Sequence, residues 1–177
     1  HKGDKKIILI LNKIDLIPVQ NALAWQRYLS REYGTVLFKA NTQIQSNNLS
    51  QSTLFDKNIK ENKSYITDVL KGNKAVGGEE LLNMLKNYSR TDNGVLGNIV
   101  VGGVGIPNVG KSSIINSLTR GKNVGVSNTP GFTKGLQEVI LDKNLRLLDC
   151  PGVVMSNNRD NILQNVIRTE DIKEPIE

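Results

Sequence analysis

Eight residues near the middle of the chain leave it few possible folds. Residues 105–112 read GIPNVGKS, which matches the phosphate-binding P-loop pattern G-x-x-x-x-G-K-[ST]. The apolar run Ile99-Val100-Val101 precedes this stretch, and apolar residues at helical spacing, Ile114, Ile115 and Leu118, follow it. A strand, a glycine-rich loop and a helix in this order predict an α/β domain with a phosphate site at the start of the helix.

The residue types suit that chemistry. Glycines at 105 and 110 allow the backbone N–H groups to approach phosphate oxygens, and the helix N-terminus adds a partial positive charge. Lys111 is expected to reach the β- and γ-phosphates, and the Ser112 hydroxyl to ligate Mg²⁺. The alternative is a glycine-rich turn in a βα unit with no ligand. The nucleotide-binding residues expected here are Asn108, Val109, Gly110, Lys111, Ser112 and Ser113.

Composition narrows the choice of partner and excludes several site classes. A net charge of +6 and a pI of about 9.4 suit an anionic partner such as RNA or a nucleotide, and equally a solvated basic surface. A single cysteine, Cys150, excludes an internal disulfide framework, so no disulfide partner is expected. The only histidine, His1, is terminal, which argues against catalysis or metal binding by histidine. No apolar run is long enough to span a membrane.

A second motif lies near the amino terminus. The run Lys6 to Leu11 is typical of a buried parallel strand, and it leads directly into Asn12-Lys13-Ile14-Asp15. This N-K-x-D sequence is similar to the guanine-reading motif of GTPases. Asp15 would accept hydrogen bonds from the N1–H and the amine of guanine, while Asn12 braces neighbouring loops and the Lys13 stem covers the base. The alternative is a simple turn at the end of a strand.

The next segment predicts a helix and a strand. Ala22 to Leu29 has helical spacing and the helix is expected to end by Gly34, with Trp25 packed in the core rather than serving as a stacking platform. A strand over 35–38 then leads to Lys39-Ala40. Ala40 resembles the alanine of GTPases whose backbone N–H contacts guanine O6, and both residues are included in the expected nucleotide site.

The middle of the chain is predicted to be an insertion. Residues 41–73 are rich in Asn, Gln, Ser and Lys, which indicates a polar loop or disordered segment; an RNA-contacting arm is the less favoured alternative. Leu81, Leu82, Met84, Leu85 and Tyr88 then trace a helical stripe that we expect to be core. A polar link leads from there to residue 97.

The residues after the P-loop helix predict a switch region. Residues 121–135 are dense in glycine and proline, which is typical of a loop that a γ-phosphate could order. Thr133 is the expected ligand of Mg²⁺ and phosphate, with Thr129 as the competing candidate; a surface turn is the alternative. Strands over 137–141 and 145–148 follow, and the second delivers Asp149-Cys150-Pro151-Gly152. Asp149 would hold Mg²⁺ through a water, and the Gly152 N–H would reach the γ-phosphate.

The order of these motifs is unusual. Ras-like GTPases place the P-loop first and the guanine motifs last, whereas here residues 12–15 and 39–40 precede residues 105–112 and 149–152. The sequence therefore predicts a circularly permuted Ras-like domain over 1–177, a three-layer α/β/α sandwich with a mostly parallel sheet. Its expected parts are a guanine-specificity half (1–40), the insertion (41–73), a helix and link (77–97), and a P-loop and switch half (98–177).

Several segments together resemble one family. LNKIDLIP, FKANTQ, GIPNVGKSS, PGFTK and DCPGVV in this order resemble the circularly permuted GTPases related to YlqF and YawG, and most of all their nucleostemin branch of nucleolar GTPases. The resemblance implies GTP and Mg²⁺ binding, slow hydrolysis, and assembly of the large ribosomal subunit on rRNA or a pre-60S particle. It also implies a nucleolar location in the nucleus. Asn41 stands where that branch more often has Ser.

The resemblance carries three further expectations. Val153 occupies the position of the glutamine that orients water in Ras-type enzymes, so intrinsic hydrolysis should be slow. Asn108 matches a P-loop asparagine that helps hold K⁺ in several GTPases without that glutamine, so potassium should stimulate hydrolysis. Family members also carry an upstream strand that would lie between the P-loop strand and the Ile7 strand; it is absent here, so the chain is expected to be a fragment.

Two other functions compete with this hypothesis. A GTP-gated scaffold would bind the nucleotide and hydrolyse little of it, and an ATP-using P-loop protein would contain NKID by coincidence. A mitochondrial or cytosolic GTPase of the same permuted group is the nearest alternative for the location. The sequence does not identify an activator.

Overall fold

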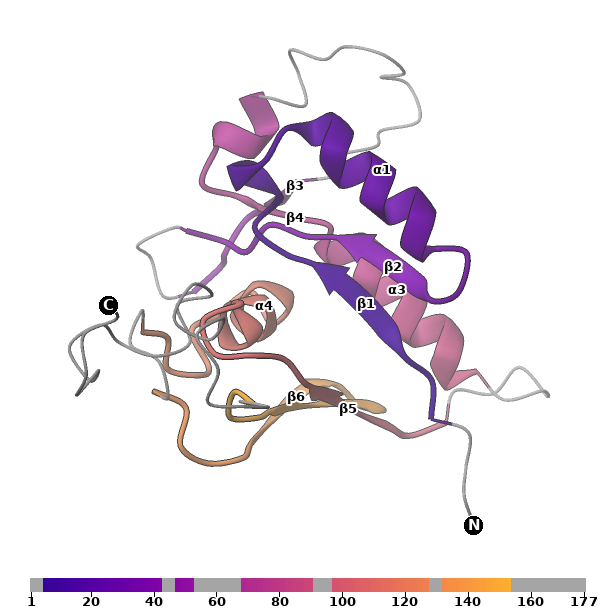
Figure 1. Ribbon diagram of the computed structural model, residues 1–177. Coiled ribbons are helices and arrows are strands. Elements are labelled where there is room, and N and C mark those ends of the chain that lie inside the picture. Colours follow the sequence, from indigo (N-terminus) through magenta and orange to yellow (C-terminus); the bar gives the residue numbers. More distant parts are fainter. Residues whose placement is uncertain (1–4, 43–46, 53–67, 91–96, 128–131, 154–177) are drawn as a thin grey trace, which may run out of the picture.

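The computed structural model in Figure 1 describes residues 5–42, 47–52, 68–90, 97–127 and 132–153. They contain both helices and strands, and strands pair in parallel in three separate places. The described part is therefore an α/β structure with mostly parallel strand pairing, as predicted. The residues outside these ranges include Thr129 and much of the predicted insertion.

The amino-terminal unit is a parallel strand pair covered by a helix on each face. β1 (Ile8–Leu11) pairs with β2 (Gly34–Leu37), and α1 (Val19–Leu29) connects them after the short 3₁₀ helix η1 (Ile14–Leu16). Successive side chains on a strand point to opposite faces. Val36 accordingly packs with the α3 and α4 side, whereas Leu37 packs with Ala22 of α1. Figure 1 shows α1 and α3 on opposite sides of this pair.

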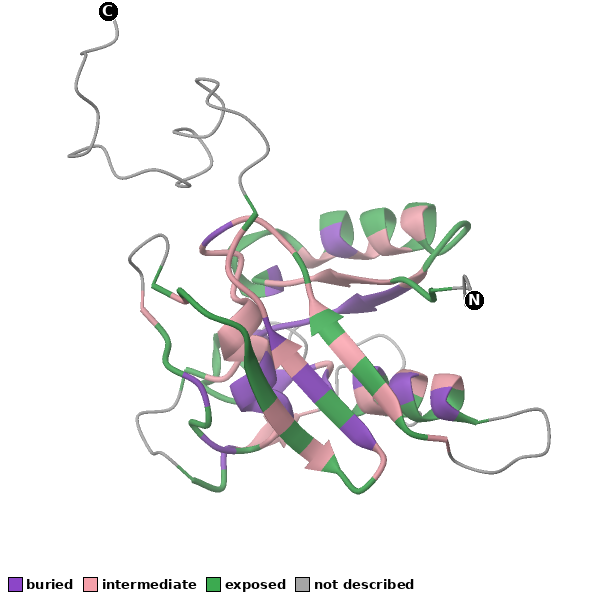
Figure 2. Cartoon of the chain, turned by 90° about the horizontal axis from the view of Figure 1, so that it is seen from below, coloured by how far each residue is buried: buried purple, intermediate pink, exposed green. Residues whose placement is uncertain are grey.

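The carboxyl-terminal unit is a three-stranded sheet in the order β5-β7-β6. β5 (Ile99–Gly103) runs parallel to β7 (Leu145–Asp149), and β6 (Gln137–Asp142) runs antiparallel to β7. Leu145 and Leu147 point into the main core against α4 (Lys111–Leu118). The alternating colours of Figure 2 follow the same period along these strands.

The outer face of this sheet has no helix over it in the described part of the chain. Val100 is 62% exposed and Ile140 is 70% exposed, and both flank Arg146 across the sheet. A complete three-layer sandwich requires a helix layer on that side. The described residues do not show one.

A short strand lies within the segment 41–73, which the sequence predicted to be largely loop or disordered. β3 (Gln51–Ser52) pairs with β4 (Ala75–Val76), just beyond that segment, while Leu49 and Leu70 are buried. These described residues of the segment are therefore packed against the rest of the fold. Isolated apolar residues in a polar background carry no period, so they gave no strand signal.

Helix α3 (Gly78–Ser89) fills the main core as predicted. Leu81 and Leu85 are buried on one of its faces, and Leu82 and Met84 pack beside them. The helix begins after Gly77, whose φ of +84° is in the left-handed region. A Cβ at residue 77 would overlap the Leu37 carbonyl. Because glycine has no Cβ, β4 and α3 can lie close to the end of β2.

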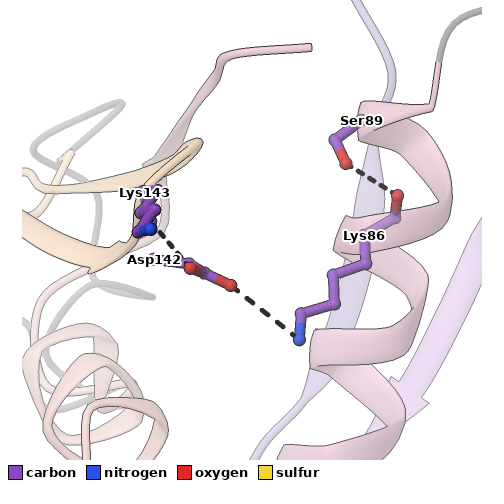
Figure 3. A network of polar contacts seen from close by, with 4 residues as sticks. All are labelled: Lys86, Ser89, Asp142 and Lys143. Carbon is purple, nitrogen blue, oxygen red and sulfur yellow. Dashed lines mark hydrogen bonds and ion pairs between the residues drawn. The ribbon is translucent and has the colours of Figure 1, made fainter. Parts of the chain in front are cut away.

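Figure 3 shows how α3 meets the turn between β6 and β7. Lys86 Nζ lies 3.9 Å from Asp142 Oδ2, and the Lys143 backbone N–H donates to Asp142 Oδ1 at 2.7 Å. The Ser89 hydroxyl donates to the Lys86 carbonyl at 2.7 Å. Since Lys86 and Asp142 are both about half exposed, the pair contributes about 1 kcal/mol at most.

The helix at 19–29 corrects one prediction. Trp25 is 58% exposed, so the expectation that it packs in the core was wrong. The helix faces the core through Ala22 and its neighbours Val19 and Leu23, and this stripe leaves Trp25 on the other side.

β1 and β5 each have one edge without a strand partner among the described residues. β1 pairs only with β2, and β5 pairs only with β7. No helix in the described ranges is long and apolar enough to cross a membrane.

Candidate nucleotide site

The P-loop has a left-handed backbone at Gly110, one of the two glycines for which the sequence predicted it. Gly110 has φ +96° and precedes α4 directly, and Asn108 has φ +61°. A Cβ on Gly110 would overlap the Asn12 amide, so only glycine permits the loop to lie this close to residue 12. The N-terminal turn of α4, with Lys111, Ser112 and Ser113, then follows at the carboxyl end of β5.

One hydrogen bond joins the two predicted motifs. The Asn12 side-chain amide donates to the Val109 carbonyl at 2.8 Å, across 97 positions of sequence. The other amide atom, Asn12 Oδ1, is buried and has no partner in the described part of the chain. Asn12 therefore braces the P-loop, which is the contact predicted for it, and places residues 13–15 beside the loop.

Lys111 is folded back over its own loop. Its Nζ donates to the Gly105 carbonyl at 3.0 Å and to the Ile106 carbonyl at 2.8 Å. Burial lowers the pKa of Lys111, while the nearby charges of Asp149 and Cys150 act in the opposite direction. A phosphate anion in the loop would supply stronger acceptors than these carbonyls and would favour the charged lysine.

Three oxygen-bearing side chains converge beside Lys111. The Ser112 hydroxyl donates to Asp149 Oδ2 at 2.6 Å, and its oxygen lies 3.3 Å from the Thr133 hydroxyl oxygen. Asp149 is fully buried, and its Oδ1 has no partner among the described residues. A buried carboxylate with an unsatisfied oxygen is costly unless a cation or donor meets it.

These three oxygens fit Mg²⁺. The ion prefers oxygen ligands and usually binds through one or two carboxylates, with waters and substrate phosphates completing the set. Within the described ranges no cluster of three or more His, Cys, Asp or Glu side chains occurs, so any metal here depends on the serine and threonine hydroxyls. Ser112, Thr133 and Asp149, predicted separately from the sequence, are brought together by the fold.

The 149–152 segment closes onto the P-loop. The Val153 N–H donates to the Gly105 carbonyl at 3.1 Å, and a Cβ on Gly152 would come within 2.6 Å of Pro107. Gly152 therefore lies against the P-loop backbone, where a nucleotide phosphate would be bound. Val153 is 42% exposed and offers no side-chain amide or acid at this position.

The residues predicted to bind the guanine base lie on the 12–15 turn and at residues 39–40. Lys13 has φ +59° and Asp15 is exposed, and the Ile14 N–H reaches the Phe38 carbonyl at 3.4 Å. This contact brings the 12–15 turn beside residues 38–40, as the order of motifs predicted. Ala40 is half-buried.

The Lys39 side chain, which the sequence predicted to contact the nucleotide, is instead held by backbone carbonyls of another segment. It is 4% exposed, and its Nζ donates to the Gly72 carbonyl and, at 3.2 Å, to the Lys74 carbonyl. Burial lowers the pKa of Lys39, and the charge of Asp15 partly offsets this. In this structure the side chain holds the 72–74 turn.

Two buried polar residues of α4 extend the site in a way that sequence reasoning missed. The Ser117 hydroxyl accepts from the Asn41 N–H at 2.8 Å and donates to the Ser113 carbonyl at 2.8 Å. The Asn116 side chain exchanges hydrogen bonds with the Val124 backbone, at 2.8 Å to its carbonyl and 2.9 Å from its N–H. Polar residues on the buried side of a predicted amphipathic helix are the signal that could have found them.

The fold and this arrangement define a class. A strand, a P-loop and a helix, with a carboxylate at the end of the neighbouring strand, are the parts of a P-loop nucleotide-binding domain. In agreement, residues 100–174 match the family model described as "50S ribosome-binding GTPase". That match covers the P-loop and switch half.

Relatives cover nearly the whole chain. A Drosophila melanogaster "Guanine nucleotide-binding protein-like 3 homolog" is 45% identical over 98% of the chain and 29% of its own length. The Arabidopsis thaliana "Guanine nucleotide-binding protein-like NSN1" is also 45% identical, over 98% of the chain and 29% of its own length. "Nucleolar GTP-binding protein 2" of Schizosaccharomyces pombe is 33% identical over 97% of the chain and 27% of its own length.

The chain belongs to the family of guanine nucleotide-binding protein-like 3 and nucleolar GTP-binding proteins. It spans less than a third of the length of these relatives.

Proposed function

We propose that this chain is the guanine nucleotide-binding domain of a GTPase that serves assembly of the large ribosomal subunit. The observation that carries the proposal is the Asn12–Val109 hydrogen bond. It joins the guanine-reading motif and the phosphate loop, which lie far apart in sequence, into one site. The circular permutation of a Ras-like domain over 1–177, with the halves predicted above, is part of the same proposal.

Each predicted site residue has a proposed role. Lys111 and the N–H groups of the 108–113 backbone bind the phosphates. Ser112 and Thr133 would hold Mg²⁺ with Asp149 acting through a water, and the ion would supply charge neutralisation at the phosphates. The Gly152 N–H contacts the γ-phosphate, and Asp15 reads guanine beside Ala40. Lys13 covers the base face.

Hydrolysis is expected to be slow and stimulated by potassium. Val153 has no group that can orient a water, and its N–H is already bonded to Gly105. A cation beside Asn108 would supply the charge that an arginine finger gives elsewhere. Single-turnover hydrolysis of GTP with Mg²⁺, in KCl and then in NaCl at equal ionic strength, tests this. Equal rates in the two salts would refute potassium stimulation.

The absence of a catalytic side chain at Val153 is also compatible with a second function. Because Val153 supplies no catalytic side chain, a GTP-gated scaffold with little hydrolysis fits the geometry as well. The same single-turnover assay with purified large-subunit precursor particles separates the two. Acceleration by the particles supports a GTPase, whereas GTP-dependent particle binding without acceleration supports a scaffold.

The nucleolar location rests on the names of relatives. One of them is called "Nucleolar GTP-binding protein 2", and we propose the nucleolus for this protein on that ground. Fluorescence imaging of the tagged full-length protein tests it. Accumulation in mitochondria or cytosol would favour the corresponding alternatives.

A further inference from the structure

The outer face of α1 presents two aromatic rings that the fold does not bury. Trp25 is 58% exposed and Tyr28 is 61% exposed. They are three positions apart, so they lie on the same side of the helix. Their ring centroids are 6.0 Å apart and the planes meet at 89°. Side chains of this size are normally covered, and an exposed pair indicates a contact with another molecule.

The same face is cationic. The Arg31 guanidinium lies 5.9 Å from the centre of the Tyr28 ring, and Arg27 is exposed in the last turn of the helix. Neither arginine forms an ion pair with another described residue. The helix itself, VQNALAWQRYL, contains no acidic residue. The face therefore combines two stacking surfaces with two arginines that have no ion-pair partner among the described residues.

This combination is more selective than an apolar patch. A partner that docked by hydrophobic burial alone would gain nothing from two arginines beside the rings, because desolvating them is costly. A single-stranded nucleic acid uses both features, since its bases stack on aromatic side chains and its phosphates accept from arginine. A duplex would leave the rings unused because its bases are already stacked.

We infer that the outer face of α1, formed by Trp25, Tyr28, Arg27 and Arg31, binds a single-stranded RNA segment. The rings stack against two bases and the arginines contact the neighbouring phosphates. The choice of RNA over single-stranded DNA rests on the proposed function in ribosome assembly. Figure 1 shows α1 on the far side of β1 and β2 from α4, so RNA and nucleotide occupy separate surfaces.

The chain provides its own probe for this face. Trp25 is its only tryptophan, so selectively excited tryptophan fluorescence reports on α1 alone. We would titrate the chain with a 12-nucleotide oligouridylate, which does not pair with itself. The expected result is saturable quenching of Trp25 emission. The logarithm of affinity should fall with the logarithm of KCl concentration with a slope of about −1.4, or about −0.7 for each of two phosphates.

Variants locate the binding. With labelled RNA and anisotropy, Trp25→Ala and Tyr28→Ala should each weaken binding at least about fivefold, since each removes one stacked base. Arg27→Gln and Arg31→Gln should each reduce the salt slope by about 0.7. The matched control is Lys143→Gln, which removes the same charge from the exposed turn between β6 and β7. It should leave affinity and slope unchanged.

Several results would overturn the inference. An absence of quenching and binding in a chain that still binds GDP would contradict it while leaving the proposed function intact. Equal losses in the α1 variants and the Lys143 control would place RNA elsewhere. Equal quenching by an RNA duplex would show a general anion patch, and stronger binding of oligodeoxythymidylate would replace RNA by single-stranded DNA. Loss of GDP binding by the unmodified chain would instead count against the proposed function.

Discussion

At the scale of single residues, Lys39 shows how a motif position can carry a structural task. Its ammonium is held by the carbonyls of Gly72 and Lys74 and is almost fully buried. Lys39→Met should lower the free energy of unfolding by about 1 to 3 kcal/mol at neutral pH, because two charge-assisted hydrogen bonds are lost. Urea denaturation measures the difference, with Lys71→Met as the control on an exposed lysine of the same region.

The pH dependence of that difference has a definite sign. Burial lowers the pKa of Lys39 in the folded state below its ordinary value of 10.5. Between those two values the unfolded chain binds more protons than the folded one, so stability rises with pH in that window. The advantage of the wild type over Lys39→Met should therefore grow as the pH approaches 10.5. A constant difference across this range would show that burial does not lower the pKa of Lys39 in the folded protein.

The sequence predicted which residues form the site better than it predicted how their side chains are oriented. Ser112, Thr133 and Asp149 were predicted one by one, and the fold brings their oxygens together because parallel strands end at a common edge. The direction of the Lys39 side chain could not be predicted, since it depends on a turn more than 30 positions away. Trp25 was predicted to be core, but it lies on the side of α1 away from Ala22 and is exposed.

At the scale of elements, α4 connects the P-loop to the segments around it. Asn116 fixes Val124 at the start of the loop that leads to Thr133. Asn116→Ala should cost about 3 kcal/mol, because it leaves two buried backbone groups of Val124 without partners. Chemical denaturation measures the loss. The exposed Asn21 of α1 is the control, and Asn21→Ala should change stability by no more than about 0.5 kcal/mol. Similar values for the two variants would refute the role of Asn116.

The junction of β4 and α3 depends on one glycine. Gly77 has φ +84°, and a Cβ would overlap the Leu37 backbone carbonyl. Gly77→Ala should therefore destabilise the fold by roughly 3 kcal/mol, through both backbone strain and displacement of β2. Gly102→Ala is the matched control, since nothing lies within 4 Å of a Cβ there. A thermal melt in which both variants behave alike would contradict the close packing at Gly77.

Most of these helices and strands could be predicted from the sequence, whereas the pairing between strands was harder to predict. The helix over 78–89 and the strands around 99 and 145 follow from hydrophobic periodicity. The β3–β4 pair was missed because two-residue strands carry no period, and its partners are far apart in sequence.

At the scale of the whole molecule, the two sequence halves meet in the main core, where Val36 and Phe38 pack with residues of α4 and β7, and through a few polar contacts. Asn12 contacts the P-loop, while Asn41 and Gln51 both bond to Ser117 of α4. β1 and β5 have unpaired edges between these halves in the described part of the chain. Such edges are sites where a further strand can pair. The nucleotide that spans both halves should therefore stabilise the molecule by mass action.

Calorimetric titration of the chain with GTP, GDP and ATP in Mg²⁺, beside Asp15→Asn, tests most directly whether both halves form one guanine site. We predict binding of GTP and GDP, no binding of ATP, and a shift of Asp15→Asn towards xanthine nucleotides, because the asparagine reverses the hydrogen-bonding pattern offered to the base. Equal binding of ATP and GTP, or an unchanged guanine preference in Asp15→Asn, would contradict the account.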